Sequence, residues 1–93
     1  MTQNKKKIVW ITGGGTGIGK ELAKKFCERN FKVIISGRRL NKLKDVQKYN
    51  KDNIIPMSLD VANYKECKKV ANKILKKYES IDIIVLNAAT YNP

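Results

Sequence analysis

Apolar and polar residues alternate in a regular order along the chain. Four short segments are almost continuously apolar, which is typical of strands buried on both faces. These segments are Ile8–Thr12, Phe31–Ser36, Ile54–Leu59 and Ile81–Leu86. Between them, apolar residues recur every three or four positions, which is typical of amphipathic helices. The helical segments are Ile18–Asn30, Leu40–Tyr49 and a third that Asn63 caps and that ends near Tyr78. We expect the third helix to bury the side chains of Cys67, Val70, Ala71, Ile74, Leu75 and Tyr78.

This alternation of strands and helices predicts an α/β fold whose parallel sheet is covered on both faces. Right-handed crossover connections then give a doubly wound sheet with the strand order 3-2-1-4. Pro56 lies in the third strand, and this strand belongs at an edge because proline cannot donate a hydrogen bond to a neighbouring strand. We expect residues 1–93 to form a single unit.

The charge of the chain narrows the possible partners. Lysine and arginine number 20 against 8 aspartates and glutamates, which gives a net charge of +12. The excess is spread along polar helix faces, and arginine, which phosphate recognition favours, is rare among the basic residues. We therefore expect no nucleic-acid partner. No segment approaches the roughly 20 apolar residues that span a bilayer, so we expect no membrane partner either.

Histidine and cysteine content limits the metal and catalytic chemistry. The chain lacks histidine, and Cys27 and Cys67 are too few for a thiolate zinc site, so we predict no metal site. The apolar run after Lys5–Lys7 is too short for a secretory signal, whose apolar region needs roughly 7–15 residues. We interpret both cysteines as small apolar helix residues of a protein in the reducing cytoplasm.

The first strand leads directly into a glycine-rich segment, residues 12–19, and a helix follows. Glycines allow positive φ angles and let a ligand approach the backbone, while the helix offers unpaired N–H groups at its amino end. In a βαβ unit, such a loop indicates a phosphate-binding site for a nucleotide. A P-loop is one interpretation of the spacing from Gly14 to Lys20. Glu21 argues against it, because magnesium binding needs Ser or Thr at that position.

The segment TGGGTGIG at residues 12–19 resembles the TGxxxGxG motif of the short-chain dehydrogenase/reductase family. The resemblance continues in order through Ser36–Arg39, Leu59–Val61 and Ile81–Ala89, the last of which is similar to the family's NNAG motif. Leu86 and Ala89 depart from that motif, and the methyl group of Ala89 narrows the groove slightly. The resemblance implies a Rossmann fold, truncated after the fourth strand, with residues 1–93 as its dinucleotide-binding half-domain.

The resemblance also implies which residues contact the cofactor. Gly13 would make the tight turn, Gly17 would let the pyrophosphate approach, and Gly19 would let the helix pack on the sheet. Asp60 would accept a hydrogen bond from the adenine amino group, beside the backbone of Val61. The expected cofactor-binding residues are Thr12, Gly13, Gly17, Ile18, Gly19, Ser36, Arg38, Arg39, Asp60, Val61, Asn87 and Ala88.

The end of the second strand indicates which dinucleotide is bound. An NAD enzyme places Asp or Glu there for the ribose 2′-hydroxyl, whereas Gly37, Arg38 and Arg39 stand here. A guanidinium can pair bidentately with a 2′-phosphate, and Lys20 or Ser36 would add a contact. We predict NADP(H) as the cofactor in preference to NAD(H); two solvated arginines are the alternative.

The catalytic Ser and Tyr-x-x-x-Lys of the family have no counterpart at the expected place. Tyr64 and Lys68 match the spacing, but they precede the fourth strand, and residues four apart on a helix are neighbours by default. We therefore predict an NADP-dependent oxidoreductase represented by its cofactor-binding part and inactive alone. The alternative is a non-catalytic nucleotide-binding or interaction module. The apolar fourth strand would be an exposed edge, for which we expect a second chain as partner.

Overall fold

The computed structural model describes residues 6–15 and 17–87. Its elements follow in the order β1 (Ile8–Thr12), α1 (Gly17–Glu28), β2 (Lys32–Ser36), α2 (Leu40–Gln47), β3 (Ile54–Pro56), α3 (Tyr64–Tyr78) and β4 (Ile83–Leu86). All strand pairs are parallel, and the sheet order is β3-β2-β1-β4. This confirms the Rossmann-type topology, with β3 and its proline at an edge.

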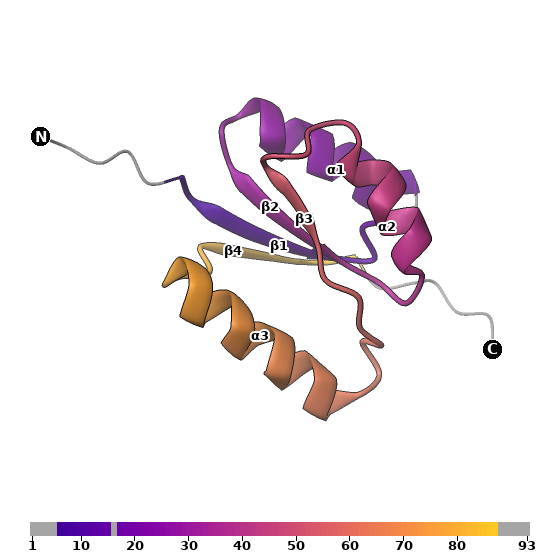
Figure 1. Ribbon diagram of the computed structural model, residues 1–93, viewed down its shortest axis with the longest axis vertical. Helices are drawn as coiled ribbons and strands as arrows, with labels where there is room; N and C mark the ends of the chain where they lie inside the picture. Colours follow the sequence, from indigo (N-terminus) through magenta and orange to yellow (C-terminus); the bar gives the residue numbers. More distant parts are fainter. Residues whose placement is uncertain (1–5, 16, 88–93) are drawn as a thin grey trace, which may run out of the picture.

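The sheet separates two hydrophobic cores, because successive side chains of a strand point to opposite faces. Helices α1 and α2 cover one face and α3 covers the other (Figure 1). On the first face, Val9 and Ile11 of β1 pack with Val33 and Ile35 of β2. On the second face, Ile8, Trp10 and Ile34 pack with Ile74 of α3. The central strand β1 is consequently buried along its whole length.

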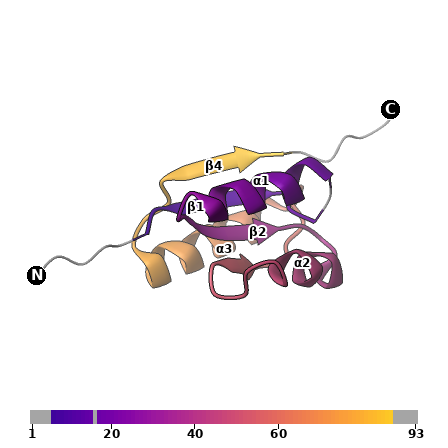
Figure 2. The same cartoon turned by 90° about the horizontal axis from the view of Figure 1, so that it is seen from above.

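Strand β4 lies at the edge of the sheet opposite β3 (Figure 2). Ile84 pairs with Trp10 and Leu86 pairs with Thr12, so both side chains belong to the face that α3 covers. Ile84 is nevertheless 52% exposed and Leu86 76% exposed. Helix α3 therefore shields β1 and β2 but leaves this part of the apolar strand in contact with solvent.

Several elements are shorter than the hydrophobic pattern predicts. Helix α1 ends at Glu28 instead of Asn30, because Asn30 takes the left-handed conformation, with φ of 69°. Strand β3 ends at Pro56 instead of Leu59, although the amides of Met57 and Leu59 still donate to the carbonyl oxygens of Ile35 and Gly37. Strand β4 begins at Ile83 instead of Ile81, and the Asp82 carboxylate instead accepts a hydrogen bond from the Ile8 amide.

Helix α3 begins as the sequence predicts but buries a narrower face. Asn63 is its N-cap, and the Asn63 side chain accepts a hydrogen bond from the Glu66 amide at 3.1 Å. Ile74 is fully buried, whereas the prediction that Leu75 points inward is wrong, because Leu75 is 44% exposed. The two residues lie about 100° apart around the helix, and only Ile74 faces the sheet.

This difference can be tested by truncating the two side chains. We expect Ile74→Ala to lower the free energy of unfolding by about 2–5 kcal/mol, because it leaves a cavity against the sheet. Leu75→Ala is the matched control and should cost less than about 1 kcal/mol, because its side chain already contacts water. Urea denaturation followed by far-ultraviolet circular dichroism measures both losses. Equal losses would contradict the described orientation of α3.

Candidate functional site

Loops from all four strands meet at one edge of the sheet. Because every strand is parallel, the segments that follow β1, β2, β3 and β4 lie together at what we call the carboxyl edge (Figure 2). Helix α1 begins at this edge with Gly17. In open α/β sheets, ligands bind in the crevice outside this edge. The expected cofactor-binding residues that the structure describes belong to these segments.

The glycine loop is held to β2 through its backbone. The amides of Gly13 and Gly14 both donate to the carbonyl oxygen of Ser36, at 2.6 and 3.1 Å. Gly13 has φ of +76°, a conformation that other residues adopt at a cost. The loop therefore turns sharply away from β1 and begins α1 next to the end of β2.

The remaining glycines divide into tightly packed and open positions. A Cβ atom on Gly14 would lie 2.6 Å from Cβ of Ile35, and one on Gly19 would overlap the carbonyl oxygen of Gly13. A Cβ atom on Gly17 would meet nothing within 4 Å. Gly14 and Gly19 thus let the loop close against the sheet, while Gly17 leaves space in front of the first turn of α1. The next residue, Ile18, is 69% exposed beside that space.

Residues at the end of β4 hold the glycine loop on the side opposite β2. Nδ2 of Asn87 donates to the carbonyl oxygen of Gly13 at 3.3 Å. The hydroxyl of Thr12 donates to the carbonyl oxygen of Val85, also at 3.3 Å. The structure therefore brings Thr12, Gly13 and Asn87 into contact, whereas Ala88 lies outside the described residues.

Two arginines stand exposed after β2. Gly37 follows the strand, and Arg38 and Arg39 precede α2, whose N-cap is Arg39. Neither guanidinium has a hydrogen-bond or ion-pair partner within residues 6–15 and 17–87. Within the described residues, both side chains are therefore exposed and unpaired next to the end of β2.

The segment after β3 is tied to the same edge. The amide of Leu59 donates to the carbonyl oxygen of Gly37 at 2.9 Å, which brings Asp60 next to the end of β2. The Asp60 carboxylate accepts a hydrogen bond from the Ala62 amide, and the Asp60 amide donates to the Glu66 carboxylate, both at 3.0 Å. The following residue, Val61, is 45% exposed. Asp60 thus keeps one carboxylate oxygen for which no bond within the described chain is recorded.

Ser36, like Thr12, is a buried member of the expected contact residues. Its side chain is fully buried, and its hydroxyl accepts a hydrogen bond from the indole N–H of Trp10 at 2.9 Å. The Ser36 hydroxyl therefore lies inside the protein and bonds Trp10, while the carbonyl oxygen of the same residue holds the glycine loop. The sequence did not predict that Trp10 contributes to the site, because a tryptophan in an apolar strand indicates only a position in the core.

Among the described residues, one cavity lies beside the glycine loop and another lies at the opposite end of the strands. The first, of about 830 Å³, runs from Gly15 and Gly17 along α1, and its charged lining residues are Lys20, Lys25, Lys42 and the acidic Glu21. Lys42 is a second residue that sequence reasoning missed, since it belongs to α2 and reaches the loop only in the folded chain. A Cβ atom on Gly15 would lie 3.2 Å from Cβ of Lys42.

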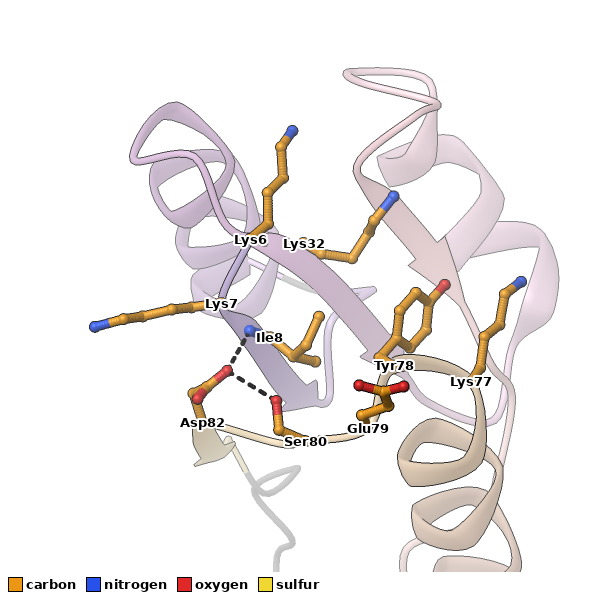
Figure 3. Close-up of a pocket in the computed structure, with 9 residues that line it drawn as sticks. All are labelled: Lys6, Lys7, Ile8, Lys32, Lys77, Tyr78, Glu79, Ser80 and Asp82. Carbon is orange, nitrogen blue, oxygen red and sulfur yellow. Dashed lines mark hydrogen bonds between the residues drawn. The ribbon is translucent and has the colours of Figure 1, made fainter. Parts of the chain in front are cut away.

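The second cavity, of about 390 Å³, lies at the opposite edge, where the strands begin (Figure 3). Lysines line it, but Lys6 already donates to the Asn53 side chain at 2.6 Å and Lys32 to the Asp52 carbonyl at 2.8 Å. None of the expected cofactor-binding residues lies there. In a chain so rich in lysine, these side chains do not by themselves mark a site.

The ionisable groups with shifted pKa values lie away from the glycine loop. Burial raises the pKa of the Cys27 thiol, and the hydrogen bond to Glu28 raises the pKa of the Tyr49 hydroxyl. Cys27 and Glu28 are in the last turn of α1, about 15 Å along the helix from Gly17 at 1.5 Å per residue. Neither group contributes to chemistry at the carboxyl edge.

Within the described chain there is no cluster of acidic residues and cysteines suited to a metal ion. No helix in that part of the chain has the length and apolar character needed to cross a membrane.

The sequence matches the family model described as short chain dehydrogenase over residues 7–93. A relative from Dictyostelium discoideum, the dehydrogenase/reductase SDR family protein 7-like, is 39% identical over 94 aligned residues. The match covers 92% of this chain and 30% of the relative.

Solved structures show the same similarity. A short chain dehydrogenase from Bacillus anthracis superposes with a TM-score of 0.85 at 35% identity, over 91% of this chain and 35% of that one. A 3-ketoacyl-(acyl-carrier-protein) reductase from Brucella melitensis, solved with NADH, has a TM-score of 0.79 at 27% identity, over 84% and 32%. The chain thus spans about a third of the length of these proteins.

The packing of the loop generates a test that needs no ligand. We expect Gly19→Ala to destabilise the protein by about 1–3 kcal/mol, because the added methyl group overlaps the Gly13 carbonyl. Gly17→Ala is the matched control: it adds the same atom where space is open, and the free energy of unfolding should be unchanged or slightly higher. Urea titration measures both values. A stable Gly19→Ala protein would disprove the described packing.

Proposed function

The chain belongs to the short-chain dehydrogenase family, a family of oxidoreductases, and from this we propose that residues 1–93 hold the adenosine and pyrophosphate of NADP(H). The observation that carries the proposal is the backbone cradle at the start of α1. Gly13, Gly14 and Gly19 pack it against the sheet, while Gly17 leaves open space before the helix. Amide groups at the amino end of a helix bind phosphate through hydrogen bonds and the helix dipole.

The fit of a dinucleotide to this cradle rests on the shape of the loop. A side chain at Gly17 would occupy the open space, so only glycine lets a pyrophosphate contact the helix amides there. We propose that Ile18 contacts the cofactor, because it is exposed beside this space. We propose that Asn87 and Ala88, at the end of β4, contact the next part of the cofactor. When bound, the nicotinamide ring supplies or accepts a hydride.

The adenosine end is proposed to lie across the end of β2. The free Asp60 oxygen is the acceptor for the adenine amino group, and exposed Val61 offers its backbone and an apolar surface. The hydrogen bond from Leu59 to Gly37 supports this placement, because it keeps Asp60 beside the arginines. Thr12 and Ser36, which are buried, are proposed to shape the site from below.

NADP(H) is proposed over NAD(H) because of the charges after β2. The ribose 2′-position would face Gly37, Arg38 and Arg39, where the chain places no Asp or Glu directly after β2 and both guanidinium groups lack partners in the described chain. A 2′-phosphate paired with a guanidinium makes short, charge-assisted hydrogen bonds. Lys20 and Lys42, which line the cavity beside the loop, add positive potential.

Of the two non-catalytic alternatives, nucleotide binding and protein interaction, the exposure of β4 favours an interaction module as the second candidate function. Ile84 and Leu86 form an apolar edge that another chain could cover by strand pairing. Binding of NADP(H) distinguishes the two, since a pure interaction module has no need of the dinucleotide. The two unpaired cysteines support our proposal of a cytoplasmic location.

The cofactor preference is tested with arginine variants. We expect Arg38→Ala to weaken NADPH binding by about tenfold, the value of one charge-assisted hydrogen bond, and to leave the Kd for NADH within about twofold. Isothermal titration calorimetry of the full chain measures both values. The control is Arg29→Ala, which removes the third arginine, beyond the far end of α1. An equal loss for both cofactors, or tighter NADH binding by the unaltered protein, would refute the preference.

The catalytic competence of these residues is tested with Tyr64. This side chain is 75% exposed at the first residue of α3. We propose that hydride transfer needs residues beyond 1–93, so the 93-residue chain should oxidise no NADPH in the presence of carbonyl compounds. Turnover that Tyr64→Phe abolishes would assign the proton transfer to this tyrosine. Turnover that survives the substitution would equally overturn the proposal.

A further inference from the structure

Trp10 occupies a central position beneath the carboxyl edge. It is the single tryptophan of the sequence and is 6% exposed, on the face of the sheet that α3 covers. Trp10 pairs with Ile34 in β2, and its indole N–H extends to the hydroxyl of Ser36, two residues further along that strand. The donor and the acceptor are both buried, so neither has water as an alternative partner.

The residue that receives this bond also holds the glycine loop. The backbone carbonyl of Ser36 is the acceptor for the amides of both Gly13 and Gly14. A displacement of Ser36 would therefore break two loop contacts and leave the buried indole N–H unpaired, which is unfavourable. The tryptophan side chain consequently defines where the end of β2 lies relative to the loop.

The same side chain supports the segment on the other side of β2. Trp10 and Leu59 belong to one buried cluster, and Leu59 directly precedes Asp60. The Leu59 amide is also bound to the Gly37 carbonyl at 2.9 Å. One indole thus bonds the residue that holds the glycine loop and belongs to the same buried cluster as the residue that precedes Asp60.

We propose that Trp10 is a positioning residue of the dinucleotide site. It acts through Ser36 on the amides of Gly13 and Gly14 and contacts no ligand itself. The expected effect of Trp10 on dinucleotide binding rests on the proposed function. Its effect on the position of the Gly13 and Gly14 amides does not, because it concerns the protein without ligand.

The effect on the loop is tested by hydrogen exchange of the full chain, measured by nuclear magnetic resonance without any dinucleotide. In Trp10→Phe a smaller aromatic ring remains, but the N–H donor is lost. We expect the Gly13 and Gly14 amides to exchange about threefold to tenfold faster, the equivalent of one hydrogen bond. The amides of Val33 and Ile34, in the middle of β2, should change less. Unchanged exchange at both glycines would overturn the proposal.

The loss of volume needs its own control. Ile34→Val removes a methylene group from the same buried cluster without touching any hydrogen bond to the loop. This variant should lower the free energy of unfolding. The ratio of the exchange rates of the Gly13 and Gly14 amides to those of the β2 amides should stay as in the unaltered protein. If Ile34→Val accelerates the glycine amides as strongly as Trp10→Phe, general destabilisation explains the result and the proposal fails.

Binding provides the second measurement. We expect Trp10→Phe and Ser36→Ala each to weaken NADPH binding by about threefold to tenfold, and the double variant to lose no more than either one, because both remove the same bond. Ile34→Val should keep the Kd of the unaltered protein. Additive losses in the double variant would overturn the proposal. An unaltered protein that binds neither dinucleotide would refute the proposed function instead, and the exchange experiment would still decide the role of Trp10 in the loop.

Discussion

The Ser36 carbonyl is the acceptor on which the carboxyl edge depends. It binds the amides of Gly13 and Gly14, so the chain leaves β1, turns against β2 and enters α1 with two of its loop amides already satisfied. The turn brings the loop so close to the sheet that side chains at Gly13, Gly14 and Gly19 would collide with their neighbours. The first turn of α1 is then left facing open space at the edge where all four strands end.

Close packing and positive charge at this edge are therefore supplied by different residues. The buried side of the loop excludes side chains and relies on interior hydrogen bonds, including the one between Trp10 and Ser36. The open side presents exposed Arg38 and Arg39. The ion pairs Lys24–Glu21 and Lys48–Asp45 each join residues three positions apart, and such surface pairs contribute little to stability.

Most of the fold could be predicted because local patterns carry it. Four apolar runs separated by amphipathic segments implied a parallel sheet, and the handedness of crossovers implied its order. Pro56 indicated the edge strand and Asn63 the start of α3, since both effects act within a few residues. Boundaries were less accurate: Asn30 ends α1 through its left-handed backbone conformation, which the hydrophobic pattern does not show, and the apolar run after Pro56 continues beyond the end of β3.

The sequence by itself determined the order of elements and the presence of a glycine loop before a helix, because periodicity and glycine spacing are properties of neighbouring residues. Only the tertiary structure decided which partners those residues find. Ser36 faces the indole of Trp10 from a different strand, Asn87 reaches Gly13 across 74 positions of sequence, and Leu75 lies outside the contact of α3 with the sheet. These outcomes depend on how strands register and how a helix is rotated, and both follow from the packing of distant side chains.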